Sequence, residues 1–243
     1  MKWPLRNAFA AWRARKTLPE AARQRIARMR RPLRGRREAL RARRAERLAT
    51  ARFVCLDLET TGPRMLHDRI ISIGAVAVRQ RMVLHAEAFE AIVRQPRASL
   101  TENILVHQIG GQDQLAGHDP AAVLLDFLEF LSDSVAVAYR AEFDEAMLSR
   151  EARACLGLCT HPRFLDLASL LPGLFPGLEN DSLDDWVAHF SLPPIERHHA
   201  VADAYTNGQL LLLVLDQAQR VQLETVGDLL DLQRAHRWLG LRH

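Results

Sequence analysis

Apolar residues gather into short runs that are typical of buried strands. The stretch from Phe53 to Leu58 is mostly apolar, and the turn-forming residues Thr-Thr-Gly follow soon after it. A tight reversal near Gln80 separates the next two runs. Four further segments are therefore predicted to be strands, the last of them turning helical along its length: 69–80, 81–93, 134–139 and 163–171.

Most of the remaining chain shows apolar positions at helical spacing. One such segment, "SLDDWVAHF", opens on a serine, a residue that commonly caps helices. Because the strands come first and then alternate with helices, the pattern predicts an α/β fold, a mixed five-stranded sheet flanked by helices. The predicted helices are 99–107, 120–131, 142–154, 182–190, 200–219 and 226–238.

The first fifty of the 243 residues differ in charge from the rest. They carry 17 Lys and Arg against three Glu, whereas the remainder carries 16 basic and 26 acidic residues. Their Ala-, Arg-, Leu- and Glu-rich composition favours helix, which Pro32 and Gly35 are expected to divide in two. Two interpretations stay open, a helical extension docked on the body or a polybasic arm that holds nucleic-acid phosphates. An acidic membrane surface or a partner protein would suit the same charge.

These features divide the chain into an Arg-rich arm (1–50), a body (51–219) and a C-terminal helical tail packed on it (220–243). No apolar run approaches the roughly 18–20 residues of a membrane span, and the start lacks the apolar core of a secretory signal. The three cysteines are too few for a disulfide framework. We therefore expect a cytoplasmic protein with reduced thiols.

Four acidic residues stand at the ends of predicted elements. Asp57 and Glu59 lie two apart at the end of the first strand and so point to one face. Asp144 opens a helix after a core strand, and Asp203 lies near the start of the long helix. Taken singly, each also fits a solvated strand end or a helix cap. Together they would repel unless cations held them, and oxygen ligands suit Mg²⁺ or Mn²⁺. His198 would then be a candidate general base.

Three separated stretches, "FVCLDLETTG", "AVAYRAEFD" and "RHHAVADA", resemble the three successive motifs of the DEDDh 3′–5′ exonucleases. That family includes the proofreading epsilon subunit of bacterial DNA polymerase III and, more distantly, ribonuclease T. The flanking stretches "ISIGAVAV" and "VHQIGG" agree as well, and the likeness covers about 51–215. The resemblance implies a ribonuclease-H-like fold and a 3′–5′ exonuclease that uses two divalent cations.

The resemblance also implies a role for each residue. Asp57 would bridge both ions, and Glu59 and Asp203 would hold the ion that carries the attacking water. Asp144 would serve the second ion, and His198 would be the general base. These five residues are the catalytic set that the resemblance implies.

The same resemblance implies contacts to the 3′-terminal nucleotide from Thr60, Thr61 and His107. One departure concerns substrate handling, because the family often has His-Asn where this chain has Tyr139 and Arg140. Arg140 would contact a phosphate, pair with a carboxylate, or simply face solvent.

Two adjacent histidines compete for the role of base. Helical spacing places His199 on the same face as Asp203, four residues later. The family pattern of histidine, four residues and aspartate selects His198 instead. On one helix a five-residue step turns about 500°, which leaves His198 about 140° away from Asp203. We therefore expect His198 on a loop before the helix, near Pro193 and Pro194, and His199 pointing elsewhere.

The leading hypothesis is a metal-dependent 3′–5′ exonuclease acting on single-stranded DNA, favoured over RNA because "LDLETTG" is closer to the DNA-proofreading branch. A ribonuclease T-like preference for RNA is the alternative substrate. The alternative function is an accessory or proofreading-type subunit that docks a DNA polymerase or another partner through the arm or the tail. A binding module with an inactive site is disfavoured, because all five catalytic positions are occupied.

Overall fold

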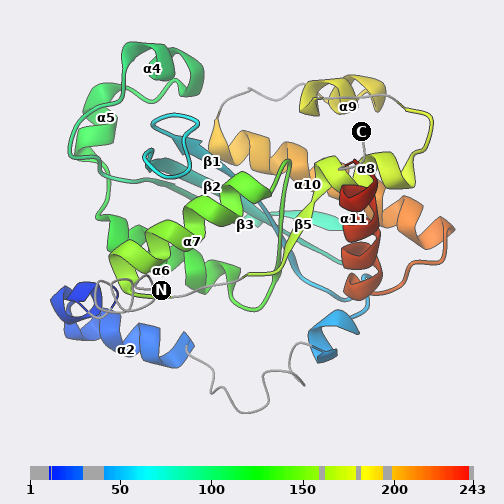
Figure 1. Ribbon diagram of the computed structural model, residues 1–243, viewed down its shortest axis with the longest axis horizontal. Helices are drawn as coiled ribbons and strands as arrows, with labels where there is room; N and C mark the ends of the chain where they lie inside the picture. The colour runs from blue at the N-terminus through cyan, green and yellow to red at the C-terminus, as the bar shows by residue number, and fades with distance from the viewer. Residues whose placement is uncertain are drawn as a thin grey trace.

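A mixed five-stranded sheet forms the centre of the molecule (Figure 1). The computed structural model describes residues 11, 13–29, 41–158, 162–178, 182–193 and 199–240. The strand order is β3-β2-β1-β4-β5, with β1, β4 and β5 parallel and β2 and β3 antiparallel to their neighbours. The predicted α/β class and the predicted strand segments are confirmed. The strands are β1 (Phe53–Thr60), β2 (Ile70–Arg79), β3 (Met82–Ile92), β4 (Val135–Ala138) and β5 (Phe164–Asp166).

Helices cover both faces of the sheet, and α4 and α5 stand together at one end of it (Figure 1). One face is covered by the helices that follow β5, and the other by those on either side of β4. The first group is α8 (Leu167–Leu174), α9 (Leu183–His189), α10 (Ala200–Arg220) and α11 (Val226–Gly240). The second is α6 (Pro120–Leu131) and α7 (Glu142–Leu156), with α2 (Glu20–Met29) outside α6. The end pair is α4 (Thr101–His107) and α5 (Gly111–Ala116).

β1 separates two apolar cores and ends in acidic residues. Phe53 and Cys55 belong to the core beneath α10, whereas Val54 belongs to the core beneath α7. Because side chains alternate along a strand, Asp57 and Glu59 continue the stripe of Phe53 and Cys55 on the α10 face. The strand thus changes from apolar to acidic on one face where α10 begins.

The turn between β2 and β3 shows how local sequence sets the hairpin. Gln80 and Arg81 both have positive φ, 50° and 60°. Two left-handed residues in succession are what a tight type I′ hairpin turn requires. The reversal predicted near Gln80 is confirmed.

The described part of the arm packs on the body. Ile26 of α2 is buried and joins the core beneath α7. Arg25 bonds to Asp126 at 2.6 Å and to Glu129 at 2.8 and 2.6 Å, both on α6. The helix expected here is interrupted at Pro19, while the break expected at Pro32 and Gly35 lies outside the described residues. These contacts fit a docked extension.

α10 is 21 residues long and carries the apolar run Leu210–Leu215. Leu210, Leu211 and Val214 are buried in the core, so this apolar face is used against the sheet. Among the described residues, no helix is both long and apolar enough to cross a membrane.

Candidate metal centre and active site

Three carboxylates meet where β1 ends and α10 begins. Asp57 and Glu59 come from β1, and Asp203 comes from the first turn of α10. Ligand oxygens of the three lie within 4.8 Å of one another, and Asp203 is buried. Carboxylates crowded in this way repel one another unless a cation lies between them. An all-oxygen donor set of this kind fits Mg²⁺ or Mn²⁺.

The fourth predicted ligand, Asp144, lies beside this group but is not one of its three members. It is the third residue of α7 and is buried. Burial raises the pKa of Asp144 to about 8, and the carboxylates of Asp166 and Glu59 act in the same direction. A carboxyl group with such a raised pKa keeps its proton at neutral pH, and a cation bound beside Asp144 would take the place of this proton.

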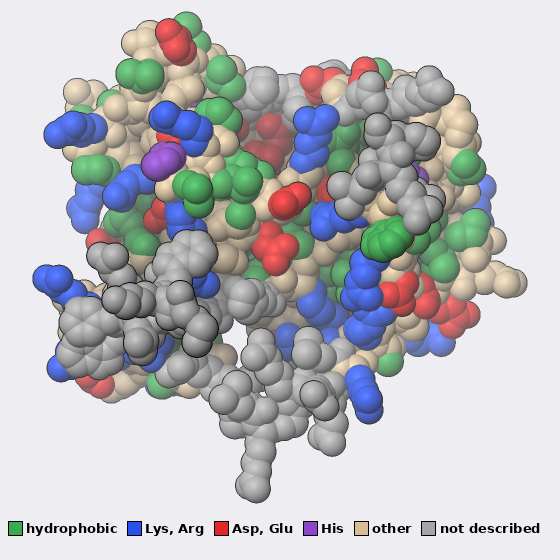
Figure 2. Space-filling model, viewed as in Figure 1, with side chains coloured by type: hydrophobic (Ala, Val, Ile, Leu, Met, Phe, Trp, Pro, Cys, Tyr) green, Lys and Arg blue, Asp and Glu red, His purple; other side chains and the backbone are tan. Residues whose placement is uncertain are grey.

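The parallel strands explain why these side chains gather. The carboxyl ends of β1, β4 and β5 meet at the same edge of the sheet. β1 ends with the two acidic residues, β4 leads into α7 with Asp144, and β5 ends at Asp166. In Figure 2 acidic side chains lie in the middle of the face in view, with basic side chains, which in the body of the chain are all Arg, around them. Asp166 was not among the residues predicted from the sequence, although its place at the end of a strand, like that of Asp57, is a signal that could have identified it.

Gly74 allows α10 to reach the sheet. It is the register partner of Asp57 on β2. A Cβ atom at Gly74 would lie 2.0 Å from the carbonyl carbon of Ala200 and 2.1 Å from the nitrogen of Val201. Only glycine leaves room for this approach. The first turn of α10 therefore crosses the strand next to Asp57 and brings Asp203 to it.

Replacing Gly74 by Ala is expected to displace the start of α10. Overpacking of this kind costs about 1–3 kcal/mol or more, and urea unfolding would measure the loss of stability. Cation binding should weaken too, because Asp203 moves away from Asp57 and Glu59. The matched control is Gly208→Ala in α10. There the nearest atom to the added Cβ atom would be a methyl carbon of Val83, at 3.3 Å. A Gly74→Ala chain that binds Mn²⁺ like the wild type would contradict this role of Gly74.

Asn207 joins the two elements that carry the carboxylates. Its Nδ2 atom donates to the carbonyl oxygen of Leu56 at 3.0 Å, and the residue is fully buried. Asn207 lies about one helical turn after Asp203, and Leu56 directly precedes Asp57. One hydrogen bond thus sets the spacing of β1 and α10 beside the site. Sequence reasoning missed it, since only the tertiary structure shows its partner.

Of the two adjacent histidines, only His199 lies within the described residues. His199 is the N-cap of α10, and its Nε2 atom lies 3.3 Å from a carboxylate oxygen of Glu90 on β3. The carboxylate that His199 contacts therefore lies on β3, whereas Asp57 lies on β1. The predictions that the helix starts after His198 and holds Asp203 in its early turns are confirmed. His198 itself lies outside the described residues, and its role stays a prediction.

The two threonines expected near the substrate shape the loop after β1. The hydroxyl of Thr60 donates to the carbonyl oxygen of Gly62 at 2.8 Å. The hydroxyl of Thr61 accepts the backbone N–H of Arg69 at 2.9 Å and lies 3.2 Å from a carboxylate oxygen of Asp68. These contacts hold the loop at the end of β1, next to the acidic group. Contact with a nucleotide stays a prediction.

The other two predicted substrate residues differ in exposure. His107 is buried at the end of α4, where Nδ1 accepts the N–H of Ile109 at 3.1 Å and Nε2 lies 3.3 Å from the hydroxyl of Ser99. Burial lowers the pKa of His107, so the ring is held neutral. Arg140 is exposed in the turn from β4 to α7, with φ of 57°. Its contact with substrate also stays a prediction.

The chain is similar to known exonucleases in sequence and in structure. The model of a protein family described as "Exonuclease" matches residues 54–211. A DNA polymerase III PolC-type of Caldanaerobacter subterraneus is 30% identical over 180 residues, which are 73% of this chain and 12% of the relative. The 3′-5′ exonuclease DinG of Staphylococcus epidermidis is 26% identical over 187 residues, 73% of this chain and 20% of the relative. The chain therefore spans only a small part of these relatives.

Solved structures show the same fold. Exonuclease I of E. coli in complex with a dT13 oligonucleotide matches with a TM-score of 0.60 at 19% identity, over 71% of this chain and 42% of that one. Exonuclease X in complex with 5′ overhanging duplex DNA matches with a TM-score of 0.55 at 20% identity, over 76% and 99%. The ribonuclease-H-like class predicted from the sequence motifs is confirmed.

Proposed function

Since this chain belongs to the exonuclease family, we propose that it hydrolyses phosphodiester bonds at the 3′ ends of nucleic acid, with single-stranded DNA as the substrate. The observation that carries this proposal is the group formed by Asp57, Glu59 and Asp203 at the end of β1. A relative named as a 3′-5′ exonuclease supports the direction, and neighbours in complex with DNA support the substrate.

The site is proposed to use two divalent cations, Mg²⁺ or Mn²⁺. Asp57, Glu59 and Asp203 would hold one, and Asp144 would serve the second with Asp57 shared. Bound cations of this kind supply Lewis acidity to the attacking and leaving oxygens. The chain itself contributes the orientation of its carboxylates, through Gly74 and Asn207, and a proton acceptor in His198. The imidazole is suited to that role because it titrates near neutral pH.

The surface beside the site fits a nucleic-acid strand. Asn103 of α4 donates from its side chain to the carbonyl oxygen of Thr61, so α4 adjoins the loop after β1. Leu66 in that loop and Leu100 and Leu105 at α4 are exposed. The exposed apolar side chains of this loop and of α4 would contact bases, while the Arg side chains near the acidic ones would contact phosphates (Figure 2). We propose that the 3′-terminal nucleotide lies between this loop and α4.

A second candidate is proofreading in association with a DNA polymerase. The observation that favours it is the similarity to PolC-type DNA polymerase III sequences, of which this chain matches about an eighth, 12% or 13%. In that case the isolated chain would degrade 3′ ends slowly, and a replicative polymerase would increase its activity on mismatched primer ends. A polymerase that leaves the rate unchanged would favour the free enzyme.

The decisive experiment follows matched DNA and RNA strands of one sequence. Strands labelled at the 5′ end should shorten stepwise in Mg²⁺, and strands labelled at the 3′ end should release their label in the first step. EDTA should stop both reactions. We expect DNA to be degraded faster than RNA, and a faster loss of RNA would select the alternative substrate. No metal-dependent release from either strand would exclude the exonuclease function.

A further inference from the structure

Asp166, at the end of β5, makes hydrogen bonds to several elements. Its Oδ1 atom accepts the N–H of Ala141 at 3.3 Å and the N–H of Ala168 at 3.2 Å. Its Oδ2 atom accepts the hydroxyl of Ser169 at 2.6 Å and a guanidinium N–H of Arg237 at 3.1 Å. The side chain of Asp166 is only 8% exposed. A buried carboxylate held in this way has a fixed orientation.

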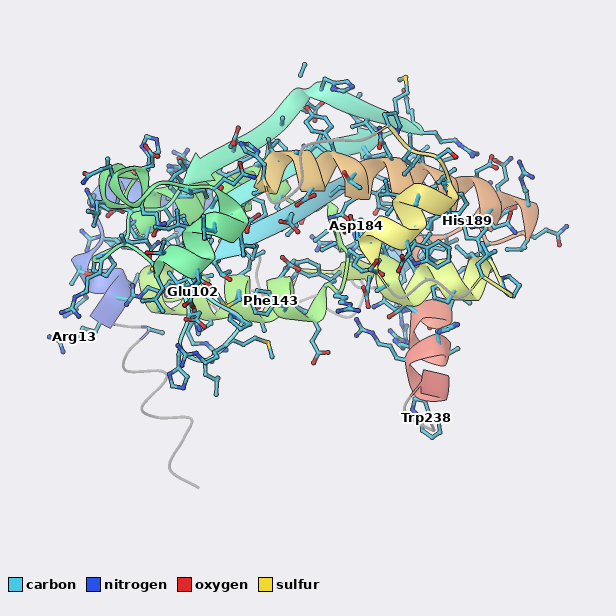
Figure 3. All side chains as sticks on the ribbon, turned by 90° about the horizontal axis from the view of Figure 1, so that it is seen from above. Arg13, Glu102, Phe143, Asp184, His189 and Trp238 are labelled. Atoms are coloured by element: carbon cyan, nitrogen blue, oxygen red, sulfur yellow. The ribbon has the colours of Figure 1, made fainter. Side chains whose placement is uncertain are left out.

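Two of the bonds at Asp166 come from α11 in the C-terminal tail. The side-chain oxygen of Gln233 accepts the backbone N–H of Asp166 at 2.8 Å, and Arg237 donates to its carboxylate. The two residues are four apart and so share one face of α11. Figure 3 shows α11 extending beyond α8, with Trp238 at its far end. The tail therefore reaches the buried end of β5 through this face.

The start of α7 depends on Asp166. Its N-cap is Ala141, which makes no side-chain capping bond, and the preceding Arg140 has positive φ. The N–H of Ala141 is instead held by Oδ1 of Asp166. Asp144 follows three residues later, within the first turn of α7. The turn that sets the direction of this ligand is thus held from β5.

We propose that Asp166 and Arg237 are positioning residues for Asp144, so that the tail helix α11 sets the affinity of the site for its cation. This inference rests on the proposed function, because it takes Asp144 as a cation ligand. Arg237 and Ser169 hold one oxygen of Asp166, which keeps the other oxygen on the N–H of Ala141. Without Arg237 the carboxylate can turn, and the first turn of α7 loses its fixed support.

α11 does not rely on Arg237 to stay docked. Val226 and Leu229 of this helix are buried in the core beneath α10. Leu232 and His236 lie against Gly173 of α8. A chain with Arg237→Ala should therefore fold, and Arg234→Ala on the same helix is its matched control. Arg234 pairs with the exposed Asp231 at 3.0 Å.

The test measures Mn²⁺ binding to the full chain without nucleic acid, by electron paramagnetic resonance of free Mn²⁺. Arg237→Ala should weaken binding of one ion on the order of tenfold, as loss of an outer partner of a metal ligand does. Arg234→Ala should bind like the wild type, and Arg237→Lys should regain most of the affinity. Hydrogen exchange at the Ala141 amide should become faster in Arg237→Ala alone.

The direction of the change separates positioning from simple charge. Removal of a nearby positive charge would by itself strengthen cation binding. Unchanged or tighter Mn²⁺ binding in Arg237→Ala would therefore overturn the inference. In an Asp166→Asn background, Arg237→Ala should cause little further loss, and an equal loss in both backgrounds would also overturn it. If the wild-type chain binds no Mn²⁺, the proposed function falls and this inference falls with it.

Discussion

Replacing Asp57 by Asn should reduce kcat/KM for metal-dependent release of nucleotides on the order of 10³-fold or more. Asp57 stands at the end of β1 in the group with Glu59 and Asp203, and the proposal gives it to both cations. Cations of this type stabilise the transition state by several kcal/mol, and each change of about 1.4 kcal/mol in the barrier alters the rate tenfold. The amide keeps the shape of the side chain but removes its charge.

The same replacement should have the opposite effect on the metal-free protein. In EDTA the three carboxylates repel one another within 4.8 Å, and neutralising one relieves part of that repulsion. The Asp57→Asn chain should therefore unfold at an equal or higher urea concentration than the wild type in EDTA. Mn²⁺ should raise the urea midpoint of the wild type much more than that of the variant, because a ligand stabilises the folded state only to the extent that it binds to it.

Glu90→Gln is the matched control for Asp57→Asn. Glu90 is the register partner of Gly74 on β3, so it lies in the same row of the sheet as Asp57 but outside the three-residue group. Its replacement should leave kcat/KM within about a few fold, as expected for a partly exposed pair with His199. Metal-dependent activity that survives Asp57→Asn would show that the carboxylate of Asp57 is not required for the reaction.

Replacing His198 by Ala should lower kcat by about 10²–10⁴-fold, the range for loss of a general acid or base. Replacing His199 by Ala should leave kcat nearly unchanged, because its ring pairs with Glu90 on β3. The two residues are neighbours of one chemical type, so each variant controls for the other. A larger loss in His199→Ala than in His198→Ala would reverse the assignment.

The pH profile gives a second measure of the His198 role. A general base must be neutral to accept a proton, so wild-type kcat at saturating Mg²⁺ should fall as the pH is lowered and the histidine becomes protonated. That decline should be absent from the residual activity of His198→Ala and present in His199→Ala. A wild-type profile that is retained in His198→Ala would assign the titrating group to another residue.

Much of the fold follows from relations between residues that are close in the chain. Alternation along β1 already places Asp57 and Glu59 on one face, because the strand period is two. The helical spacing of apolar residues over 200–219 likewise predicts correctly where α10 starts. These inferences succeed since each depends on local geometry, which the order of residues determines.

The convergence of the site was decided by contacts between distant segments. The approach of α10 to β1 requires the missing side chain of Gly74 and the bond from Asn207 to Leu56. The support of Asp144 by Asp166 and Arg237 joins β5, α7 and α11. No periodicity encodes such contacts, because their partners are set by how the sheet and helices pack. Neighbouring residues thus identify the carboxylates, while tertiary packing decides which of them meet and what holds them there.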